Sequence, residues 1–469
     1  MSERARRLAV VGAGISGLAA AAELARLARE SSTELELSVF EASARPGGKL
    51  LTEEFAGAQV DLGAESLLLR EPEILAAVTE LGLKASVIRP ATTSASIWNG
   101  RRLNPIPRRS VLGVPLQPWR PDVIRAIGLA GAARASVEPW IRRGRPEPDG
   151  PLGGFLRRRV GNAAFSGLVD PLLGGVYAGP AADLSLGAVA PPLLAAAQRN
   201  GSLLRGLRQA AALAAPTSAE TPFASFALGL GQLVKALLGK LPSGSIELAR
   251  PVAGLAPADG GRVRVQTATE ALVVDGVVLA VPAPAAAMVL GGLGPGLVPL
   301  LRRLEYASVA TVTLAYPDRA IGQPLLGSGF LVARRPRRPV TACTFLDRKW
   351  PHLRQPGLTI LRASAGSFGD EWLLALDDTT LVSAVHRELR GILSLTEVPA
   401  EVRVERWHGG LPQYRTGHLE WRARVFEAAA ELPAPLVLTG AAFGGVGVAS
   451  CLREGAGAGR ALWASTQPS

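Results

Sequence analysis

The sequence has few of the residues that build metal clusters and disulfide frameworks. It contains 2 cysteines and 4 histidines among 469 residues. Two cysteines exclude a disulfide framework and a cysteine-rich metal site, and the histidines lack the close pairing that helical zinc sites use. We also find no Ser-His-Asp set and no paired carboxylates. The sequence therefore predicts no metal site, and no side chain is assigned a catalytic role.

Lysine is also scarce, because arginine supplies nearly all of the basic charge. The chain has 51 Lys+Arg against 39 Asp+Glu, a net charge of +12. Such an excess favours acidic partners, among them nucleic acid, anionic lipid and an acidic small molecule. A compositional bias toward arginine and alanine explains the excess equally well. We expect an acidic small molecule and no nucleic acid.

One long hydrophobic run raises the question of a membrane span. Residues 276–301, "GVVLAVPAPAAAMVLGGLGPGLVPLL", carry no charge and are long enough to cross a bilayer. Four prolines interrupt the run, and each removes a backbone donor and clashes with the preceding turn of a helix. We therefore expect a buried strand, a short helix and a loop. With no signal peptide ahead of the first strand, a cytoplasmic location is expected.

The amino-terminal stretch "LAVVGAGISGLAAAAELARLARE" predicts a dinucleotide-binding turn. An apolar strand runs into Gly12-Ala13-Gly14-Ile15-Ser16-Gly17, and a helix pattern follows at once. In this fingerprint the first glycine makes the tight turn, the second lets the pyrophosphate approach, and the third lets the helix pack on the strand. The helix amino terminus then faces the phosphates. A second strand ends at Glu41, where a carboxylate can accept the ribose hydroxyls.

Three further segments favour FAD over NAD. "EASARPGGKL" places Gly47-Gly48 between Arg45 and Lys49, a second backbone approach to the pyrophosphate. "QVDLGAES" predicts a short strand that turns at Gly63. Near the carboxyl terminus, "PLVLTGAAFGGVGVASCLRE" predicts another strand, glycine loop and helix, whose amino terminus can stabilise negative charge on a reduced flavin.

Taken together, several stretches resemble the oxygen-dependent protoporphyrinogen and coproporphyrinogen oxidases of the flavin amine oxidase superfamily. The most specific are "GVYAGPAADLSL" and "RWHGGLPQYRTGH", and the resemblance runs from Val10 to Glu454. It implies an α/β fold with a discontinuous Rossmann-like FAD-binding domain, a largely antiparallel substrate-domain sheet and a helical subdomain. The expected division is 1–85, 216–290 and 406–469 for the FAD-binding domain, 86–104 and 291–405 for the substrate domain, and 105–215 for the helical region, which also touches the membrane.

The resemblance also implies which residues form the site. For the cofactor these are Gly12, Ala13, Gly14, Ile15, Ser16, Gly17, Glu41, Ala42, Arg45, Gly48, Lys49, Gly63, Ala64, Glu65, Ser66, Val252, Trp407, Gly440, Val446, Gly447 and Val448. For the substrate they are Gly175, Leu331, Lys84 and Arg89. Gly175 and Leu331 would pack on the tetrapyrrole, whereas the two cations would meet its propionates. An ordinary turn glycine, a core leucine and surface cations are the competing interpretations.

The implied reaction is the six-electron, oxygen-dependent oxidation of protoporphyrinogen IX to protoporphyrin IX in haem synthesis, which releases hydrogen peroxide. The alternative is oxidation of coproporphyrinogen III to coproporphyrin III. Further alternatives are an inactive flavoprotein scaffold and an amine-oxidase-like flavoenzyme. The scaffold alternative is motivated by Ala441, where the family often has asparagine. Transfer of product to a ferrochelatase, peripheral contact with the inner face of the cell membrane, and a homodimer stay open.

Overall fold

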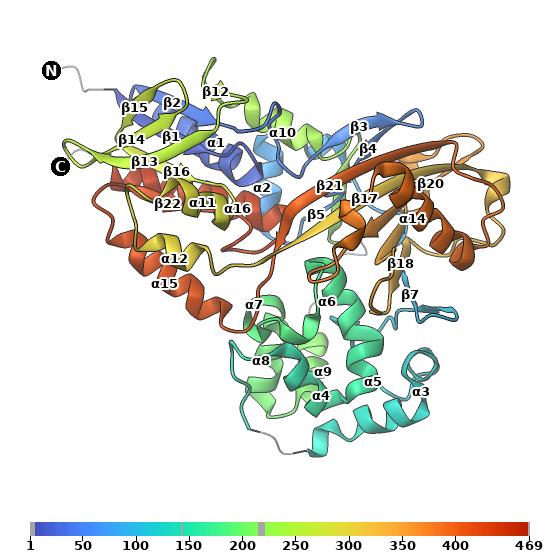
Figure 1. The fold of residues 1–469 in the computed structure, drawn as a ribbon. Coiled ribbons are helices and arrows are strands. Elements are labelled where there is room, and N and C mark those ends of the chain that lie inside the picture. The colour runs from blue at the N-terminus through green and yellow to red at the C-terminus, as the bar shows by residue number, and fades with distance from the viewer. Residues whose placement is uncertain (1–4, 142–143, 214–220, 468–469) are drawn as a thin grey trace.

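The computed structural model describes residues 5–141, 144–213 and 221–467. Figure 1 shows three parts: a parallel sheet with its helices, a long twisted sheet beside it, and a helical part packed below. Both ends of the described chain lie at the parallel sheet. The mixed α/β fold expected from the sequence is confirmed.

The parallel sheet has five strands drawn from distant parts of the chain. Its order is β12 (Ile246–Glu247), β2 (Leu35–Phe40), β1 (Arg6–Val11), β16 (Gly276–Leu279) and β22 (Leu436–Leu438). All four pairings are parallel. A parallel sheet is covered on both faces, so its central strands are continuously apolar; Leu8, Ala9 and Val10 are 0% exposed.

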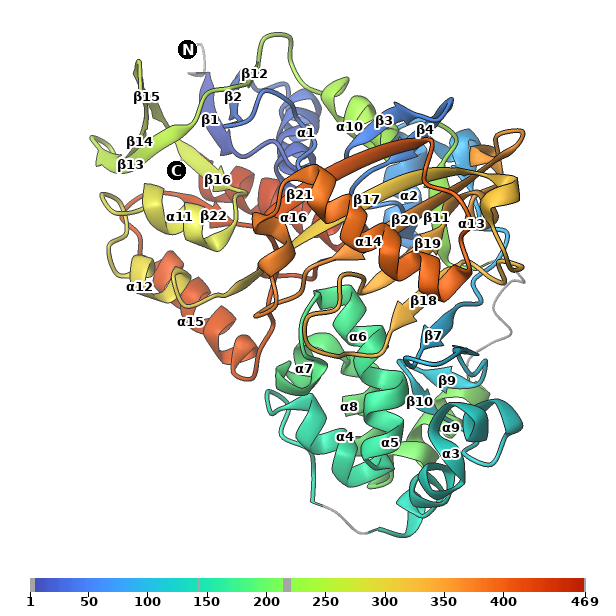
Figure 2. The same ribbon diagram turned by 45° about the vertical axis from the view of Figure 1, so that its right-hand side comes forward.

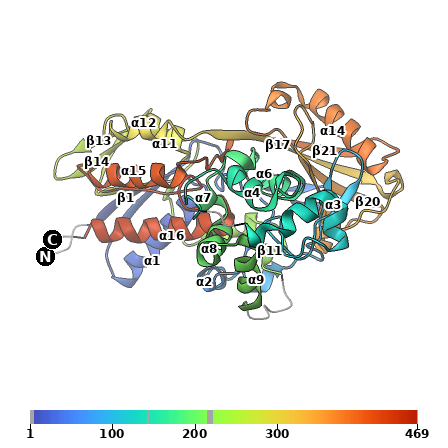
Figure 3. The ribbon, with the colours of Figure 1, turned by 90° about the horizontal axis from the view of Figure 1, so that it is seen from below.

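Two long helices cover one face of this sheet. α1 (Ile15–Glu30) and α16 (Val448–Ser465) lie side by side although they are more than four hundred residues apart (Figure 3). Gly455 and Gly459 of α16 allow this approach, because a Cβ atom there would stand 2.2 Å from the Ser16 oxygen and 2.7 Å from the Ala20 oxygen. The alanine-rich face of α1 therefore meets a seam of small residues that ties the carboxyl terminus to the dinucleotide turn.

The hydrophobic run at 276–301 forms β16, α11 (Ala283–Val289) and a second short helix, α12 (Leu297–Leu301). The expected strand and short helix are confirmed, and α12 lies where we expected a loop. Within the described ranges, no helix is long and apolar enough to cross a membrane.

The second sheet has seven strands in the order β21 (Glu401–Pro412), β17 (Tyr306–Pro317), β20 (Leu358–Ala365), β19 (Ala342–Phe345), β18 (Gly329–Val332), β7 (Ser96–Trp98) and β8 (Leu103–Pro105). Only the pairing of β18 with β7 is parallel. The amphipathic helix α14 (Asp378–Leu393) lies on one face of this sheet, as Figure 2 shows. It packs there through Leu381, Val385 and Leu389. The expected antiparallel character is therefore confirmed.

The segment between the strands β8 and β11 (Phe223–Phe226) is mainly helical, as expected. Its helices are α3 (Pro121–Ser136), α4 (Leu152–Val160), α5 (Asn162–Ala164), α6 (Asp170–Tyr177), α7 (Leu186–Val189), α8 (Pro191–Asn200) and α9 (Leu203–Leu213). The short strands β9 (Ser110–Val111) and β10 (Val114–Pro115) are exceptions. Residues 142, 143, 214 and 215 of the expected helical region lie outside the described residues.

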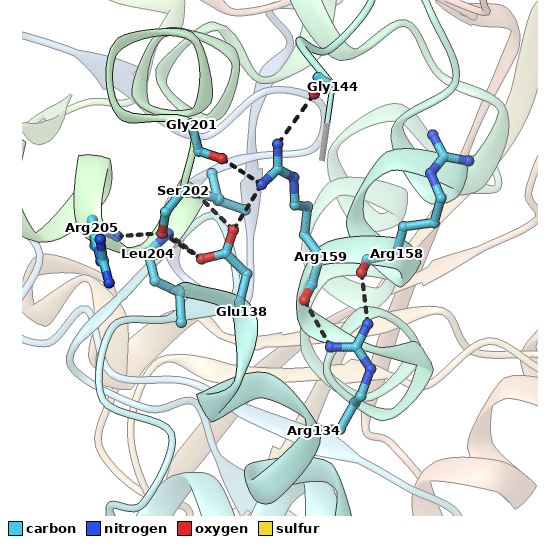
Figure 4. A network of polar contacts seen from close by, with 10 residues as sticks. Arg134, Glu138, Gly144, Arg158, Arg159, Gly201, Ser202, Leu204 and Arg205 are labelled. Atoms are coloured by element: carbon cyan, nitrogen blue, oxygen red, sulfur yellow. Dashed lines mark hydrogen bonds and ion pairs between the residues drawn. The ribbon is translucent and has the colours of Figure 1, made fainter. Parts of the chain in front are cut away.

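A buried ion pair holds this helical segment together (Figure 4). Glu138 and Arg159 are nearly inaccessible to solvent and meet at 3.2 Å. The carboxylate also accepts from the Leu203 and Leu204 amides at 2.8 and 3.0 Å, and from the Ser202 hydroxyl at 2.7 Å. It therefore caps α9, since these amides are among those that a helix start leaves without partners. The Arg159 guanidinium in turn donates to the Gly201 carbonyl at 2.6 Å.

Several smaller elements complete the fold. These are the hairpin β3 (Thr52–Phe55) and β4 (Ala58–Asp61), the sheet of β5 (Leu67–Leu68), β11 and β6 (Val87–Ile88), the sheet of β13 (Val252–Ala258), β14 (Arg262–Thr267) and β15 (Ala271–Val274), and the helices α2 (Pro72–Glu80), α10 (Gly231–Leu238), α13 (Leu346–Lys349) and α15 (His418–Ala430). The expected domain boundary at residue 405 falls within β21, and the six-part division stays a prediction.

Candidate cofactor and substrate site

The turn between β1 and α1 has the geometry that a dinucleotide needs. Gly12 adopts a φ of +100°, which side chains rarely tolerate. A Cβ on Gly17 would stand 1.8 Å from the Gly12 oxygen, so only glycine fits there. A Cβ on Gly14 would meet nothing within 4 Å, although this glycine lies at the start of α1. The protein therefore leaves room at Gly14, where the phosphates are expected.

Glu41 lies at the end of β2 and faces this turn. One carboxylate oxygen accepts from the Ala13 amide at 2.7 Å, and the other accepts from the Ser43 amide at 2.9 Å and hydroxyl at 2.8 Å. These bonds fix the carboxylate beside the turn. An ionised carboxylate has about four acceptor positions, so it retains capacity for ribose hydroxyls.

The second glycine segment packs directly on the first. The Gly47 amide donates to the Ala13 carbonyl at 2.8 Å, and a Cβ on Gly48 would stand 3.2 Å from the Gly14 Cα. Lys49 follows, and desolvation lowers the pKa of its ammonium group. Within the described part of the chain, no hydrogen bond or ion pair engages its ammonium group. Lys49 is thus available to an anionic ligand.

Gly63 brings three of the predicted cofactor residues together. A Cβ there would stand 2.1 Å from the Lys49 oxygen and 3.1 Å from the Trp407 ring. The Trp407 Nε1 donates to the Thr311 hydroxyl at 3.2 Å, and this hydroxyl donates to the Leu62 carbonyl at 2.7 Å. The seven-stranded sheet therefore holds the 61–66 segment against Lys49.

Glu65 differs from the other predicted positions because its carboxylate is already paired. It is bound by Lys349 at 2.5 Å and by Arg362 at 2.5 Å. Arg362 also donates to the Asp61 and Gly63 carbonyls at 2.7 and 2.9 Å. The side chain of Glu65 thus anchors its segment, and any contact of residues 64–66 with a cofactor would use other atoms.

The carboxyl-terminal loop returns to the same place. Gly440 follows β22 with a φ of +120°, and Gly447 precedes α16. The Ser16 hydroxyl donates to the Cys451 carbonyl at 3.0 Å, which joins the first turns of α1 and α16. Two helix amino termini therefore lie together, and both favour negative charge.

The remaining predicted cofactor positions lie around this turn and loop. The amides of Ala249 and Arg250, just before Val252, donate to the carbonyls of Ser43 and Glu41 at 2.8 Å each. Ala42 is exposed beside Glu41, Arg45 is half-buried in the same segment, and Ser66 precedes β5. Val446 packs on the helical core and Val448 on the core beneath α1. Contact of each with a cofactor stays a prediction.

The residues that the structure brings together at this turn and loop fit FAD. The glycine turn, the carboxylate of Glu41 and the ammonium of Lys49 suit an adenosine and a pyrophosphate, and the loop before α16 suits the flavin end. Within the described residues, no group of three or more His, Cys, Asp and Glu side chains could hold a metal ion.

The four predicted substrate residues fall into two places. Gly175, on α6, faces Leu331, on β18: a Cβ at Gly175 would stand 3.1 Å from a Leu331 methyl group. Arg89 instead donates to the carbonyls of Thr221 and Phe223 near β11, at 3.1 and 3.4 Å. Lys84 is exposed at the turn before β6. Their roles toward a substrate stay predictions.

Sequence reasoning missed several residues that build the site. Arg362 and Tyr414 each bond to a segment of the predicted cofactor site, and Asp61 accepts from the Leu230 amide just before α10, yet only their neighbours were singled out. Arg362 had a visible signal, since it interrupts the apolar strand "LTILRASA" and a buried charge needs a partner.

A parallel sheet with this glycine turn, joined to an antiparallel sheet and a helical part, defines an FAD-dependent oxidoreductase. The sequence matches the flavin-containing amine oxidoreductase family over residues 15–462, and the chain belongs to that family. FAD is its cofactor.

Similar proteins span almost the whole chain. A coproporphyrinogen III oxidase of Mycobacterium leprae (strain TN) is 36% identical, and one of Bacillus subtilis (strain 168) is 31% identical; each alignment covers 97% of this chain and 97% of the relative. A crystal structure from Exiguobacterium sp. 255-15, described as a proposed protoporphyrinogen oxidase, aligns with a TM-score of 0.86 at 32% identity. It covers 97% of this chain and 98% of that one.

Proposed function

We propose that this protein is an oxygen-dependent porphyrinogen oxidase of haem synthesis, and that its substrate is coproporphyrinogen III. The observation that carries the proposal is the near full-length similarity to two proteins named coproporphyrinogen III oxidase. The sequence favoured protoporphyrinogen IX, with coproporphyrinogen III as the alternative. The relatives support the alternative better, whereas the similar crystal structure keeps protoporphyrinogen IX as the second candidate.

The pairing of Gly175 with Leu331 supports a flat, apolar substrate. Gly175 and Val176 are exposed on α6, and Leu331 is half-buried on the facing strand β18. A glycine opposite a leucine leaves a shallow apolar wall on which a tetrapyrrole face can pack, and an apolar lining is typical of small-molecule sites. In this proposal the glycine makes room and the leucine limits the tilt of the ring.

Positive charge at the rim of this wall supports an acidic substrate. Arg334 lies three residues beyond Leu331, is exposed, and donates to the Ser367 hydroxyl at 2.8 Å. Burial raises the pKa of Asp170, at the start of α6, while the charges of Arg334 and Arg157 act in the opposite direction. Guanidinium groups bind carboxylates well, and coproporphyrinogen III has two more propionates than protoporphyrinogen IX.

In the proposed reaction, no side chain is assigned a catalytic role. FAD, when bound, supplies the two-electron oxidation that each round requires. The glycine turn, Glu41 and Lys49 would hold its adenosine and pyrophosphate, and the two helix amino termini would favour negative charge beside it. The substrate wall would orient the ring and exclude water.

The test is a parallel assay of the FAD-loaded protein in air with each porphyrinogen. Porphyrin fluorescence and hydrogen peroxide are followed and corrected for autoxidation. We expect faster turnover of coproporphyrinogen III. Faster turnover of protoporphyrinogen IX would instead make protoporphyrinogen IX the substrate. FAD binding without turnover of either would refute the oxidase proposal and favour the scaffold or the amine-oxidase-like alternative.

A further inference from the structure

The segment "RWHGGLPQYRTGH" contains one tyrosine, Tyr414, whose contacts reach the carboxyl-terminal loop at residues 440–447. Its hydroxyl donates to the Ala441 carbonyl at 2.5 Å and accepts from the Gly445 amide at 2.9 Å. One phenol therefore bridges both ends of a short glycine-rich stretch. Gly445 has a φ of +122°, which glycine adopts readily, so its backbone does not by itself fix the conformation of this stretch.

The peptide group that follows Gly445 is held as well. The Cys451 thiol donates to the Gly445 carbonyl at 3.5 Å, and the Cys451 carbonyl accepts from Ser16 in the dinucleotide turn. Tyr414 and Cys451 thus hold the two peptide groups on either side of the Gly445 Cα atom. Because Cys451 lies in the first turn of α16, the backbone conformation at Gly445 is linked to the helix amino terminus that faces the cofactor.

A row of stacked aromatic rings packs beside the Tyr414 phenol. The His418 ring lies 3.9 Å from that of Tyr414 at 15°, and Trp421 stacks on His418 at 5.1 Å and on Phe443 at 5.7 Å. Burial lowers the pKa of His418 to about 4, so its ring is neutral at pH 7. Phe443 belongs to the 440–447 loop. The loop is therefore held both through its backbone hydrogen bonds and through the packing of this side chain.

Tyr414 also reaches the substrate side. Its ring lies 5.5 Å from that of Tyr177, two residues beyond Gly175 on α6. Its carbonyl accepts from the Ser185 amide at 2.8 Å, and the side chain of its neighbour Gln413 donates to the Tyr177 carbonyl at 2.6 Å. The same short segment therefore contacts both the helix of the proposed substrate wall and the loop of the cofactor.

We propose that Tyr414 is a positioning residue that sets the 440–447 loop against the flavin and couples that loop to helix α6. The inference uses FAD binding, and its link to α6 rests on the proposed function. Without the hydroxyl, Ala441 and Gly445 lose their shared partner and the loop can adopt other conformations. The flavin environment then changes, even though the aromatic stack remains.

The test compares Tyr414→Phe with a matched control, Tyr316→Phe. Tyr316 is equally buried, at 0% against 2% exposure, and also stacks on a histidine, His386, to which its hydroxyl bonds at 2.9 Å. It lies on β17 in the core beneath α14. Each variant loses one buried hydroxyl, so thermal unfolding alone cannot distinguish them. The FAD dissociation constant, the visible flavin spectrum and the flavin midpoint potential can.

We expect Tyr414→Phe to weaken FAD binding about ten-fold, to shift the flavin absorption bands and potential, and to lower kcat with little change in KM. Tyr316→Phe should leave all of these at the wild-type values. Identical flavin properties in the two variants would overturn the proposal. If Tyr414→Phe does not fold, Cys451→Ala removes the bond to the neighbouring Gly445 carbonyl, and an unchanged flavin spectrum there would overturn the proposal that the conformation at Gly445 sets the flavin environment. Because the flavin measurements need no porphyrinogen, their outcome is separate from that of the oxidase assay.

Discussion

At the scale of single residues, Asp61 shows how a buried carboxylate links two elements. It ends strand β4, accepts from the Leu230 amide at 2.9 Å and from the Thr52 hydroxyl at 2.5 Å, and so joins the hairpin to the start of α10. Burial raises its pKa to about 6, against the hydrogen bonds that lower it. The ionised form is therefore disfavoured in the folded protein.

This shift predicts a pH dependence of stability. A folded pKa above the unfolded value of 3.8 means that the folded state binds the proton more tightly, so the contribution of Asp61 to stability rises as pH falls. With saturating FAD, we expect the free energy of unfolding of wild type, relative to Asp61→Asn, to rise by about 1 kcal/mol between pH 7 and pH 5. Urea unfolding at both pH values measures this difference.

Asp377→Asn is the matched control. Asp377 caps α14 and is exposed, and its hydrogen bonds with Thr380 lower its pKa. Its stability difference should not change between pH 7 and pH 5, since both the folded and unfolded pKa lie below that range. Equal behaviour of the two variants would show that Asp61 is not the group that titrates.

Gly175 tests the substrate wall directly. Gly175→Leu places a side chain against Leu331, where even a Cβ stands at 3.1 Å, and should abolish porphyrinogen turnover while FAD still binds. Leucine favours a helix more than glycine does, so the fold should survive. Gly391→Leu is the control, because Gly391 is exposed on α14 with nothing within 4 Å of its Cβ position. Turnover is measured by porphyrin fluorescence. Full turnover by Gly175→Leu would refute the proposed substrate wall.

At the scale of elements, the β1–α1 turn contains one glycine that the fold needs and a second that is predicted to serve the ligand. Gly17 lies against the Gly12 carbonyl, whereas Gly14 has open space and an ordinary φ of −69°. The two glycines stand three residues apart in one motif, but their constraints differ. The constraint on Gly17 comes from the protein, and we predict that any constraint on Gly14 comes from the dinucleotide.

Alanine at each position should therefore give different results. We expect Gly14→Ala to unfold at nearly the wild-type temperature without FAD, and to bind FAD at least ten-fold more weakly because the methyl group meets the pyrophosphate. We expect Gly17→Ala to lower the unfolding temperature even without FAD. Calorimetry of the apoprotein and flavin titration measure both effects. Loss of stability in Gly14→Ala, with FAD affinity intact, would contradict this assignment.

At the scale of the whole molecule, exposed aromatic residues lie at both ends of helix α3 in the helical part. Trp119 is 56% exposed and Trp140 is 73% exposed, and they flank α3, on which Leu129 is also exposed. Arg120 and Arg125 lie among them. Tryptophan beside basic residues is typical of surfaces that bind the interface of anionic membranes.

We expect the FAD-loaded protein to float with vesicles that contain phosphatidylglycerol, and less so with phosphatidylcholine alone or in about 0.5 M salt. The double variant Trp119→Ser, Trp140→Ser should bind these vesicles more weakly. Trp372→Ser, at an exposed tryptophan next to the seven-stranded sheet, should bind as wild type does. Equal flotation of all three proteins would show that the surface around α3 does not contact lipid.

The sequence alone determined the parts whose signal is local. A glycine turn between a strand and a helix, and a strand and short helix within a proline-interrupted apolar run, depend on neighbouring residues, and each was predicted at its place. The helix α12, by contrast, was expected to be a loop. The cofactor followed from the same patterns.

Only the tertiary structure decided which distant segments meet, because the partners of a buried charge or phenol are chosen by packing and not by spacing. Glu65 was expected at the cofactor, yet its carboxylate pairs with Lys349 and Arg362, some three hundred residues away. Tyr414 carried no local signal for the loop that its hydroxyl bridges. The glycine seam between α1 and α16 likewise has meaning only once the two helices lie together, since close approach is a property of the pair.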